Sequence, residues 1–552
     1  MKSDAWEGGH RMPLIIRWPG KTVAGSTNDG LVCFTDLLAT FAELFKVELP
    51  PDAGPDSFSF LESLMGATES QTHVRDKFVM RAGSLPSMMT IRSGDWKLIT
   101  ELGSGGFTQP KRIKSGPGDP AGQLYNLADD RGERNNVYLQ KPDVVARLAA
   151  EMNTIVDDGR SRLAIHKVDR STLTGSVMVG YQGWFNCEGD GAELGCTHWW
   201  RNRNQAFGPG NLSVDLWPDV SELNEDERFA TKFKHADGST AEVFSSGNRK
   251  TVVRHFQWMR DYGIDGSFLQ RFAHGLRRDS GKRHKDNVLS HVREGAEETG
   301  RSYAMMYDLT GLPAGGTKAV RDDWTALRRE KHITKDAAYQ RHAGKPVVAV
   351  WGVGFNEGSK PREYSLAECR ELIDFLKQDG CSVMLGVPTG WREQERDAMV
   401  DPELHDALKL ADVISPWTPG RYRDLKGVAR HADKFWQPDI QWCHTQSLDY
   451  MPVVFPGFSW HNLKGEKLDA IPRLKGQFLW SQITAAKRAG SEMLYVAMFD
   501  EVDEGTAIFK CTNDPPVGEG VSFLTYEGLP SDHYLKLVGR AGKLLRGELE
   551  SE

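Results

Sequence analysis

The stretch YVAMFDEVDEGT, residues 495–506, carries an apolar strand directly into four acidic residues within five positions. Neighbouring carboxylates repel one another, so a cluster of this kind is costly unless the fold compensates for it. A short apolar run bounded by polar residues is typical of a strand inside a fold. The stretch therefore predicts a strand whose carboxyl end carries chemistry, and the rest of the chain is interpreted outward from it.

Strands and helices alternate throughout the sequence that precedes this stretch. The predicted strands are Val177–Tyr181, Gly266–Gln270, Ser302–Tyr307, Pro346–Val350, Ser382–Gly386, Val413–Ser415, Pro452–Phe455 and Met493–Phe499. The predicted helices between them include Asn287–Thr299, Asp322–Lys331, Ser365–Gln378 and Ile471–Arg488. Eight strands that alternate with helices favour an α/β fold of the (β/α)8 TIM-barrel type over residues 176–548. A doubly wound open sheet is the alternative, but the Gly-rich phosphate turn that usually accompanies it is missing.

The first part of the chain has a different pattern. An apolar run at Pro13–Gly20 predicts a strand, and Asp36–Phe45 has apolar residues at helical spacing. Thr90–Arg92 and Trp96–Ile99 predict a hairpin that turns at Ser93-Gly94-Asp95. An amphipathic helix is expected from Pro142. These elements indicate a small α+β domain over residues 1–162, and we expect a linker at 163–175.

Charge and hydropathy exclude several classes of function. The chain has 552 residues, a net charge of −7 and a pI of about 6.2. An acidic protein is a poor partner for nucleic acid or for an anionic membrane surface. No apolar run reaches the ~18–20 residues that cross a membrane. The first ten residues have no signal-peptide core, which predicts a cytoplasmic chain as it stands, or a periplasmic or secreted one if a leader precedes it.

Tryptophan and cysteine usage narrows the chemistry further. The 16 Trp residues point mildly to carbohydrate, because flat apolar rings stack on sugar faces, although core packing explains many of them. The seven Cys residues form no CxxC pair, so we expect no zinc site, no other metal and no cofactor. Cys187 and Cys196 could pair in an oxidising compartment, but the odd number of Cys favours reduced thiols.

The N-terminal third resembles the C-terminal part of the sulfatase family. The resemblance covers residues 1–160 and rests on KSDAWEGGHRMP (2–13), FTDLLAT (34–40), IRSGDWKLI (91–99) and QLYNL (123–127), followed by Asp130, Glu133, Asn135 and Asn136. It implies that Lys2 stands where the family has its sulfate-binding lysine. None of the seven Cys lies in the family's C/S-x-P/A-x-R motif, and the acidic metal ligands have no counterpart. The segment is thus interpreted as a remnant or a fusion junction.

Residues 1–160 are expected to show no sulfatase activity. A single lysine can stabilise charge on a sulfate group, but it supplies neither a nucleophile nor a metal. The measurement is hydrolysis of an aryl sulfate ester with added calcium. Turnover above the rate of the buffer would contradict this interpretation of the segment.

The acidic cluster after the last strand provides the candidate catalytic residues. Glycoside hydrolysis typically uses two carboxyl groups about 5–9 Å apart, one of which acts as an acid. Glu501 and Glu504 lie three residues apart in a turn and can reach such a separation. A solvated loop or a calcium-binding loop is the alternative interpretation of the same residues.

The C-terminal two-thirds resembles glycoside hydrolase family 99, the endo-α-mannosidase family related to family 71. DEVDEGT (500–506) is similar to the family's N-E-W-H-E-G-T, with Val502-Asp503 in place of Trp-His. GYQGWF (180–185) and YDLTG (307–311) resemble further strand-end motifs of the family, and Trp460-His461-Asn462, after the seventh predicted strand, also fits a sugar site. The resemblance implies a retaining mechanism through a 1,2-anhydro sugar, with Glu501 as the base on the 2-hydroxyl and Glu504 as the acid/base. The substituted pair leaves the sugar itself open.

Other polar and aromatic residues near predicted strand ends are candidates for substrate contact, with core packing as the alternative for each. These residues are Tyr181, Trp184, Arg271, Tyr307, Asp308, Trp351, Trp460, His461 and Asp503. The expected function is hydrolysis of an α-linked polysaccharide or oligosaccharide. The alternative is a non-catalytic carbohydrate-binding barrel. The expected partner is a carbohydrate, and the sulfatase-like segment makes a sulfated glycan one candidate.

Overall fold

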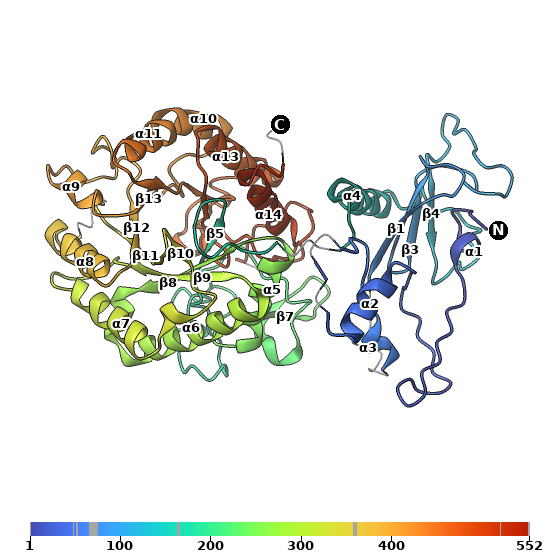
Figure 1. The fold of residues 1–552 in the computed structure, drawn as a ribbon, viewed down its shortest axis with the longest axis horizontal. Coiled ribbons are helices and arrows are strands. Elements are labelled where there is room, and N and C mark those ends of the chain that lie inside the picture. Colours follow the sequence, from blue (N-terminus) through green and yellow to red (C-terminus); the bar gives the residue numbers. More distant parts are fainter. Residues whose placement is uncertain are drawn as a thin grey trace. The chain divides into compact units, whose positions relative to one another are not determined.

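The computed structural model describes residues 2–47, 49–50, 53–65, 75–162, 166–356, 362–518 and 520–549. The chain forms two compact units, Met1–Ala164 and Ile165–Glu552 (Figure 1). The first three residues of the predicted linker, 163–165, lie outside the described residues. All seven Cys residues are free thiols.

The first unit is built on a four-stranded antiparallel sheet. Its strands are β1 (Lys77–Arg81), β2 (Met89–Ser93), β3 (Trp96–Ile99) and β4 (Gln123–Asn126), hydrogen-bonded in that order. Its helices are α1 (Glu7–His10), α2 (Asp36–Leu44), α3 (Leu61–Leu64) and α4 (Pro142–Asp158). Leu148 and Met152 of α4 pack on buried apolar residues of the sheet, among them Leu98. Burial of that apolar face joins the helix to the sheet.

A buried ion cluster joins the sulfatase-like motifs to one another. The Lys97 ammonium is 1% exposed and lies 3.0 Å from a carboxylate oxygen of Glu7 and 3.0 Å from one of Glu133. These three residues come from the first, third and last of the matched segments. A buried lysine requires such partners, because an unpaired charge inside a protein is strongly destabilising. The motifs therefore hold this small fold together.

Two predictions for the first unit have different outcomes. The hairpin is confirmed, since β2 and β3 pair with Ser93 opposite Trp96 and Gly94 turns with a φ of 57°. The strand predicted at Pro13–Gly20 is wrong, because the segment has no ladder partner among the described residues and Ile15 is 89% exposed. An apolar run becomes a strand only where another strand pairs with it.

The second unit is a parallel barrel with helices around it (Figure 1). Its strands follow the order β14 (Asp449–Tyr450), β13 (Val413–Pro416), β12 (Ser382–Val387), β11 (Lys345–Trp351), β9 (Ser302–Asp308), β8 (Gly266–Phe272), β5 (Val177–Tyr181), β16 (Leu494–Val496) and β15 (Val453–Val454). Every neighbouring pair in this order is parallel. The predicted strands are present; most differ by one or two residues at an end, and the predicted Met493–Phe499 is reduced to Leu494–Val496.

The barrel closes through the segment that contains both ends of this order. The Met451 amide donates to the Ile414 carbonyl of β13 at 2.9 Å, and the Pro452 carbonyl accepts from the Tyr495 amide of β16 at 3.1 Å. β14 and β15 are therefore two halves of a single strand between β13 and β16. Pro452 has no amide proton, which interrupts the ladder at that point. The predicted (β/α)8 barrel is confirmed.

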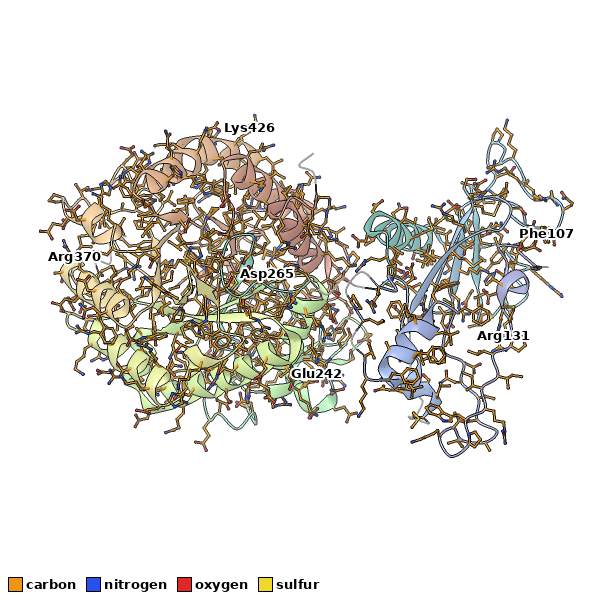
Figure 2. The ribbon with its side chains drawn as sticks, viewed as in Figure 1. Phe107, Arg131, Glu242, Asp265, Arg370 and Lys426 are labelled. Atoms are coloured by element: carbon orange, nitrogen blue, oxygen red, sulfur yellow. The ribbon has the colours of Figure 1, made fainter. Side chains whose placement is uncertain are left out.

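Helices surround the barrel on its outside. They are α5 (Arg249–Asp261), α6 (Asp279–Thr299), α7 (Thr317–Arg329), α8 (Leu366–Gln378), α9 (Leu404–Leu408), α10 (Leu425–His431), α11 (Gln437–Thr445), α13 (Gln477–Arg488) and α14 (His533–Leu545). The short helix α12 (His461–Lys464) lies in the loop between β15 and α13. Figure 2 shows Arg370 on α8 and Lys426 on α10 at the outer rim of this ring. The helix predicted from Ile471 begins only at Gln477, because the residue before Pro472 is disfavoured in helical geometry and Lys475 has a φ of 52°.

Side chains alternate along each barrel strand between the interior and the helices. Met178, Phe268, Ala304, Met306 and Ala349 belong to one apolar cluster inside the barrel. Their strand neighbours belong to a second, larger cluster that includes residues of the surrounding helices. This alternation decides which strand-end residues reach the mouth. A small hairpin of β6 (Phe229–Lys234) and β7 (Thr240–Val243) and a two-residue strand β10 (Arg341–His342) complete the unit.

Candidate active site

A cavity of about 550 Å³ lies at the carboxyl ends of the barrel strands. Residues at the carboxyl ends of β5, β8, β9, β11, β13, β15 and β16, or in the loops that follow these strands, line it. They are Gln182, Trp184, Gln270, Phe272, Asp308, Thr310, Trp351, Arg362, Trp417, Pro419, Gly420, Arg421, Arg423, Phe458, Trp460, Glu466, Ala470, Ile471, Glu501 and Glu504. This is the end of a barrel at which active sites are found.

Glu501 and Glu504 both face this cavity. Glu501 is 4% exposed; the Gln182 side-chain amide donates to one of its oxygens at 3.0 Å and the Thr506 hydroxyl to the other at 3.2 Å. Glu504 is more open to the cavity, and its backbone carbonyl accepts from the Ser459 amide at 2.9 Å. The first carboxyl group is thus held in a fixed orientation, and the second is accessible to a ligand.

The electrostatics of the cluster favour protonated carboxyl groups. Burial, followed by the charge of Glu504 and of the two aspartates, raises the pKa of Glu501 well above its usual range. Burial and the charge of Asp503 raise the pKa of Glu504 to about 7. Because two adjacent buried carboxyl groups resist ionising together, the pair keeps a proton near neutral pH. One acid and one base in the same pocket is the combination that acid–base catalysis requires.

Asp500 anchors the acidic turn to the first barrel strand. Its carboxylate accepts hydrogen bonds from the backbone amides of Gln182 at 2.8 Å and Gly183 at 2.9 Å. Burial raises its pKa to about 7 although these two bonds act against the rise. Asp500 is fully buried and does not line the cavity. Its role in the turn is therefore to position its neighbour Glu501.

Four tryptophans form the walls of the cavity: Trp184, Trp351, Trp417 and Trp460. Each is partly exposed, and the Trp351 and Trp417 rings meet edge to face with centroids 5.6 Å apart. Flat apolar faces with polar groups between them suit a sugar ring, which has apolar faces and a polar rim. Of the predicted contacts, Trp184, Asp308, Trp351 and Trp460 lie here.

Three other predicted contacts point away from the cavity. Tyr181 is fully buried, and its hydroxyl lies 2.9 Å from a ring nitrogen of His255 on α5. Arg271 is 1% exposed and donates two hydrogen bonds to Asp323 on α7, whose carboxylate also accepts one from the Tyr307 hydroxyl. These side chains occupy the outward positions of their strands, so each packs against a helix. The geometry makes them part of the barrel framework.

His461 and Asp503 lie beside the cavity without lining it. The His461 ring meets the backbone carbonyl of Glu466 at 2.8 Å. Asp503 is 4% exposed and lies 3.1 Å from a ring nitrogen of His198, and this imidazole stacks on Trp184 with ring centroids 3.7 Å apart. Asp503 thus supports a wall of the cavity through His198.

Sequence reasoning missed several residues of the cavity. Gln182 and Gln270 are the inward neighbours of Tyr181 and Arg271, and their side-chain oxygens have no hydrogen-bond partner in the part of the chain that the structure describes. These oxygens are available to sugar hydroxyls. Because side chains alternate along a strand, counting from the apolar interior residues of β5 and β8 would have identified both glutamines as inward-facing. Trp417, Arg362 and Arg421 lie in loops after β13 and β11, where no periodic signal exists.

The sequence predicts no metal site, and its resemblance to sulfatases places Lys2 at the position of that family's sulfate-binding lysine. Across the described ranges, no three His, Cys, Asp or Glu side chains gather in a way that could hold a metal ion. Lys2 is exposed to solvent. None of the described helices is long and apolar enough to cross a membrane.

A closed (β/α)8 barrel with two carboxyl groups and aromatic walls at its mouth is a glycosidase-like fold. No family model matches the chain. Among solved structures, a GH99 endo-α-mannosidase from Bacteroides thetaiotaomicron is similar, with a TM-score of 0.49 and 16% identity, over 68% of this chain and 99% of that one.

The N-terminal third is similar to curated sulfatases. An N-acetylgalactosamine-6-O-sulfatase of Bacteroides thetaiotaomicron is 32% identical over 154 residues, which are 28% of this chain and 29% of that protein. Arylsulfatase G of Rattus norvegicus is 29% identical over 175 residues, which are 29% of this chain and 32% of that protein. The chain thus spans less than a third of the length of these relatives. The sulfatase resemblance of the first unit is confirmed.

Proposed function

We propose that the second unit hydrolyses α-mannosidic linkages within a glycan, with retention of configuration, through a 1,2-anhydro sugar. One observation carries the proposal: Glu501 and Glu504 share a cavity walled by four tryptophans at the mouth of the barrel. Burial raises the pKa of both carboxyl groups, so the pair keeps a proton near neutral pH, which supports an acid beside a base in this pocket. The Gln182 and Thr506 bonds to Glu501 support the role of a fixed base.

The proposed reaction has two steps that mirror each other. In the first, Glu501 takes the proton of the sugar 2-hydroxyl, and that oxygen bonds to the anomeric carbon as the glycosidic bond breaks. Glu504 gives its proton to the departing oxygen. In the second, Glu504 takes a proton from water and the water oxygen bonds to the anomeric carbon as the bond between that carbon and the 2-oxygen breaks; the released 2-oxygen recovers its proton from Glu501. Each carboxyl group returns to its starting state.

The pH dependence of turnover follows from the acid role. Because the pair must hold one proton to react, kcat/KM is expected to fall at acidic pH, where both carboxyl groups are protonated, and at alkaline pH, where the pair has lost that proton. The measurement is release of reducing ends from an α-mannan between pH 5 and pH 9. A rate that still rises at pH 9 would contradict the requirement for a protonated acid in the pair.

Stability provides an independent test of the same group. A carboxyl group whose pKa is higher in the folded chain binds a proton more tightly there, so its contribution is fully present below pH 4.5 and is lost as the pH rises through 7. Glu504→Gln is expected to unfold at a higher urea concentration than the wild type at pH 8 and to differ little at pH 4.5. An equal difference at both values would contradict the raised pKa.

A carbohydrate-binding barrel without catalysis is the second candidate function, because Val502-Asp503 replaces the Trp-His of the family motif. In the structure Val502 is fully buried and Asp503 pairs with His198. Incubation of the full chain with α-mannans, α-glucans and sulfated glycans separates the two functions. Binding without release of reducing ends from any of them would favour the binding protein.

A further inference from the structure

Three arginines line the cavity on loops that follow other strands than β16, which leads into the acidic turn. Arg362 follows β11, and Arg421 and Arg423 follow β13. In the closed barrel β11 and β13 are the two neighbours of β12, which lies opposite β5. The strand formed by β14 and β15 separates β13 from β16. β12 adds no side chain to the wall, since Trp351 covers Gly386 so closely that a Cβ there would lie 2.4 Å from the ring. The arginines therefore dominate the charge of this wall.

Two of the arginines have guanidinium nitrogens available to a ligand. Arg421 is 27% exposed, and its Nε donates to Asp397 at 2.7 Å. Within the described ranges its terminal nitrogens make no hydrogen bond. Arg423 is exposed and has no ion pair with any described residue. The Asp397 bond orients the Arg421 fork but uses only one of its donors.

Arg362 extends the same wall. Its guanidinium lies over the Trp351 ring at 5.3 Å from the centroid, and its Nη1 donates to the Thr310 hydroxyl at 3.0 Å. Stacking on an aromatic ring and a hydrogen bond hold this charge at the edge of the cavity. The other charged residues that line the cavity, Asp308, Glu466, Glu501 and Glu504, are all acidic.

The three arginines therefore supply the positive charge among the residues that line the cavity. Neutral sugar hydroxyls are served by amides such as those of Gln182 and Gln270. Guanidinium groups fit sulfate and carboxylate, whose oxygens accept paired, charge-assisted hydrogen bonds. An anion on the substrate would be repelled by an ionised Glu501 or Glu504, so the arginine loops are the part of the cavity that favours it.

We propose that the cavity takes an α-linked glycan that carries an anionic substituent, a sulfate ester or a uronate carboxylate, on a sugar adjacent to the cleaved linkage. Arg421 and Arg423 bind the anion, and Arg362 adds to the positive potential there. This proposal rests on the proposed hydrolase activity, which supplies the α-linked sugar chain that carries the anion. It identifies Arg421 and Arg423 as residues that determine specificity.

The test compares three α-mannan preparations: neutral, chemically sulfated, and oxidised at C6 to the uronate. The R421Q/R423Q double variant is expected to lose at least ~10-fold in kcat/KM on the preferred anionic preparation, the loss of a hydrogen bond to a charged group. Its kcat/KM on the neutral preparation should change less than threefold. The sulfated and oxidised arms distinguish the two anions. R430Q, an exposed arginine of α10 outside the cavity, is the matched control.

The outcomes separate this proposal from the hydrolase activity. Equal losses on neutral and anionic mannan, or a wild type that prefers the neutral one, would overturn the anion site and leave the activity intact. If none of the three is cleaved, calorimetry of the full-length Glu504→Gln protein with the same preparations decides. Binding of an anionic preparation that R421Q/R423Q or R423Q alone weakens supports the site, and absence of such binding overturns it. Urea midpoints confirm that each variant is folded.

Discussion

Replacing Glu504 with glutamine is expected to lower kcat by at least ~10³-fold, because a positioned general acid contributes roughly 10²–10⁴-fold and glycosidic oxygens are poor leaving groups without a proton. Glu501→Gln should cause a comparable loss, since the 2-hydroxyl then keeps its proton. Both amides fill the volume of the carboxyl groups, so binding of the oligosaccharide should remain within a few-fold of the wild type. The measurement is single-turnover cleavage of an α-mannan oligosaccharide together with calorimetric binding.

Glu466 provides the matched control for this prediction. It also lines the cavity and is also a glutamate, but it lies outside the acidic turn. Glu466→Gln is expected to keep most of the turnover. Equal losses in all three variants would show that the effect comes from general charge removal, and the assignment of the catalytic pair would fail.

Replacing Arg271 with alanine is expected to lower the free energy of unfolding by about 3–5 kcal/mol, the usual cost of removing one partner of a buried ion pair. Arg271 donates to Asp323 at 2.7 and 2.6 Å and to Asp286 at 2.6 Å. Its loss leaves the buried Asp323 carboxylate with the Tyr307 hydroxyl as a remaining donor. The measurement is urea denaturation of the full chain followed by tryptophan fluorescence.

Arg370 on α8 is the control for Arg271. It is 37% exposed and lies 3.4 Å from Glu403 at the surface, at the rim shown in Figure 2. Arg370→Ala is expected to cost about 0–1 kcal/mol, as exposed pairs do. If Arg271→Ala left stability unchanged and raised KM instead, Arg271 would be a substrate contact and its framework role would be wrong.

The barrel could be predicted because each of its strands is apolar and each is separated from the next by a helical pattern. The acidic turn was also predictable, since four acidic residues directly follow the last strand. The role of the long segment between β5 and α5, residues 182–248, could not be predicted. His198 in that segment contacts Asp503 across 305 positions, and no local pattern reports a contact of that separation.

The errors among the predicted contacts have one physical cause. Arg271 and Tyr307 were chosen because they end their predicted strands, but strand residues alternate between the two faces. Gln270 and Asp308, one position away, face the cavity. Gln270 and Asp308 each lie two positions after an interior residue, Phe268 and Met306, and therefore share the inward face of their strand. The arginine wall lies in loops, which carry no such periodicity, and only the folded chain brings it together.

The most direct test of the proposed reaction is the configuration of the first product, followed by proton NMR during cleavage of an α-mannan oligosaccharide by the full chain. Attack by the 2-hydroxyl followed by water inverts the anomeric carbon twice, so the product should appear as the α-anomer and mutarotate later. The substrate must have its 2-hydroxyl trans to the leaving group, as α-mannosides do. A β-anomer as the first product, or cleavage confined to 1,2-cis glycosides such as α-glucosides, would contradict the roles of Glu501 and Glu504.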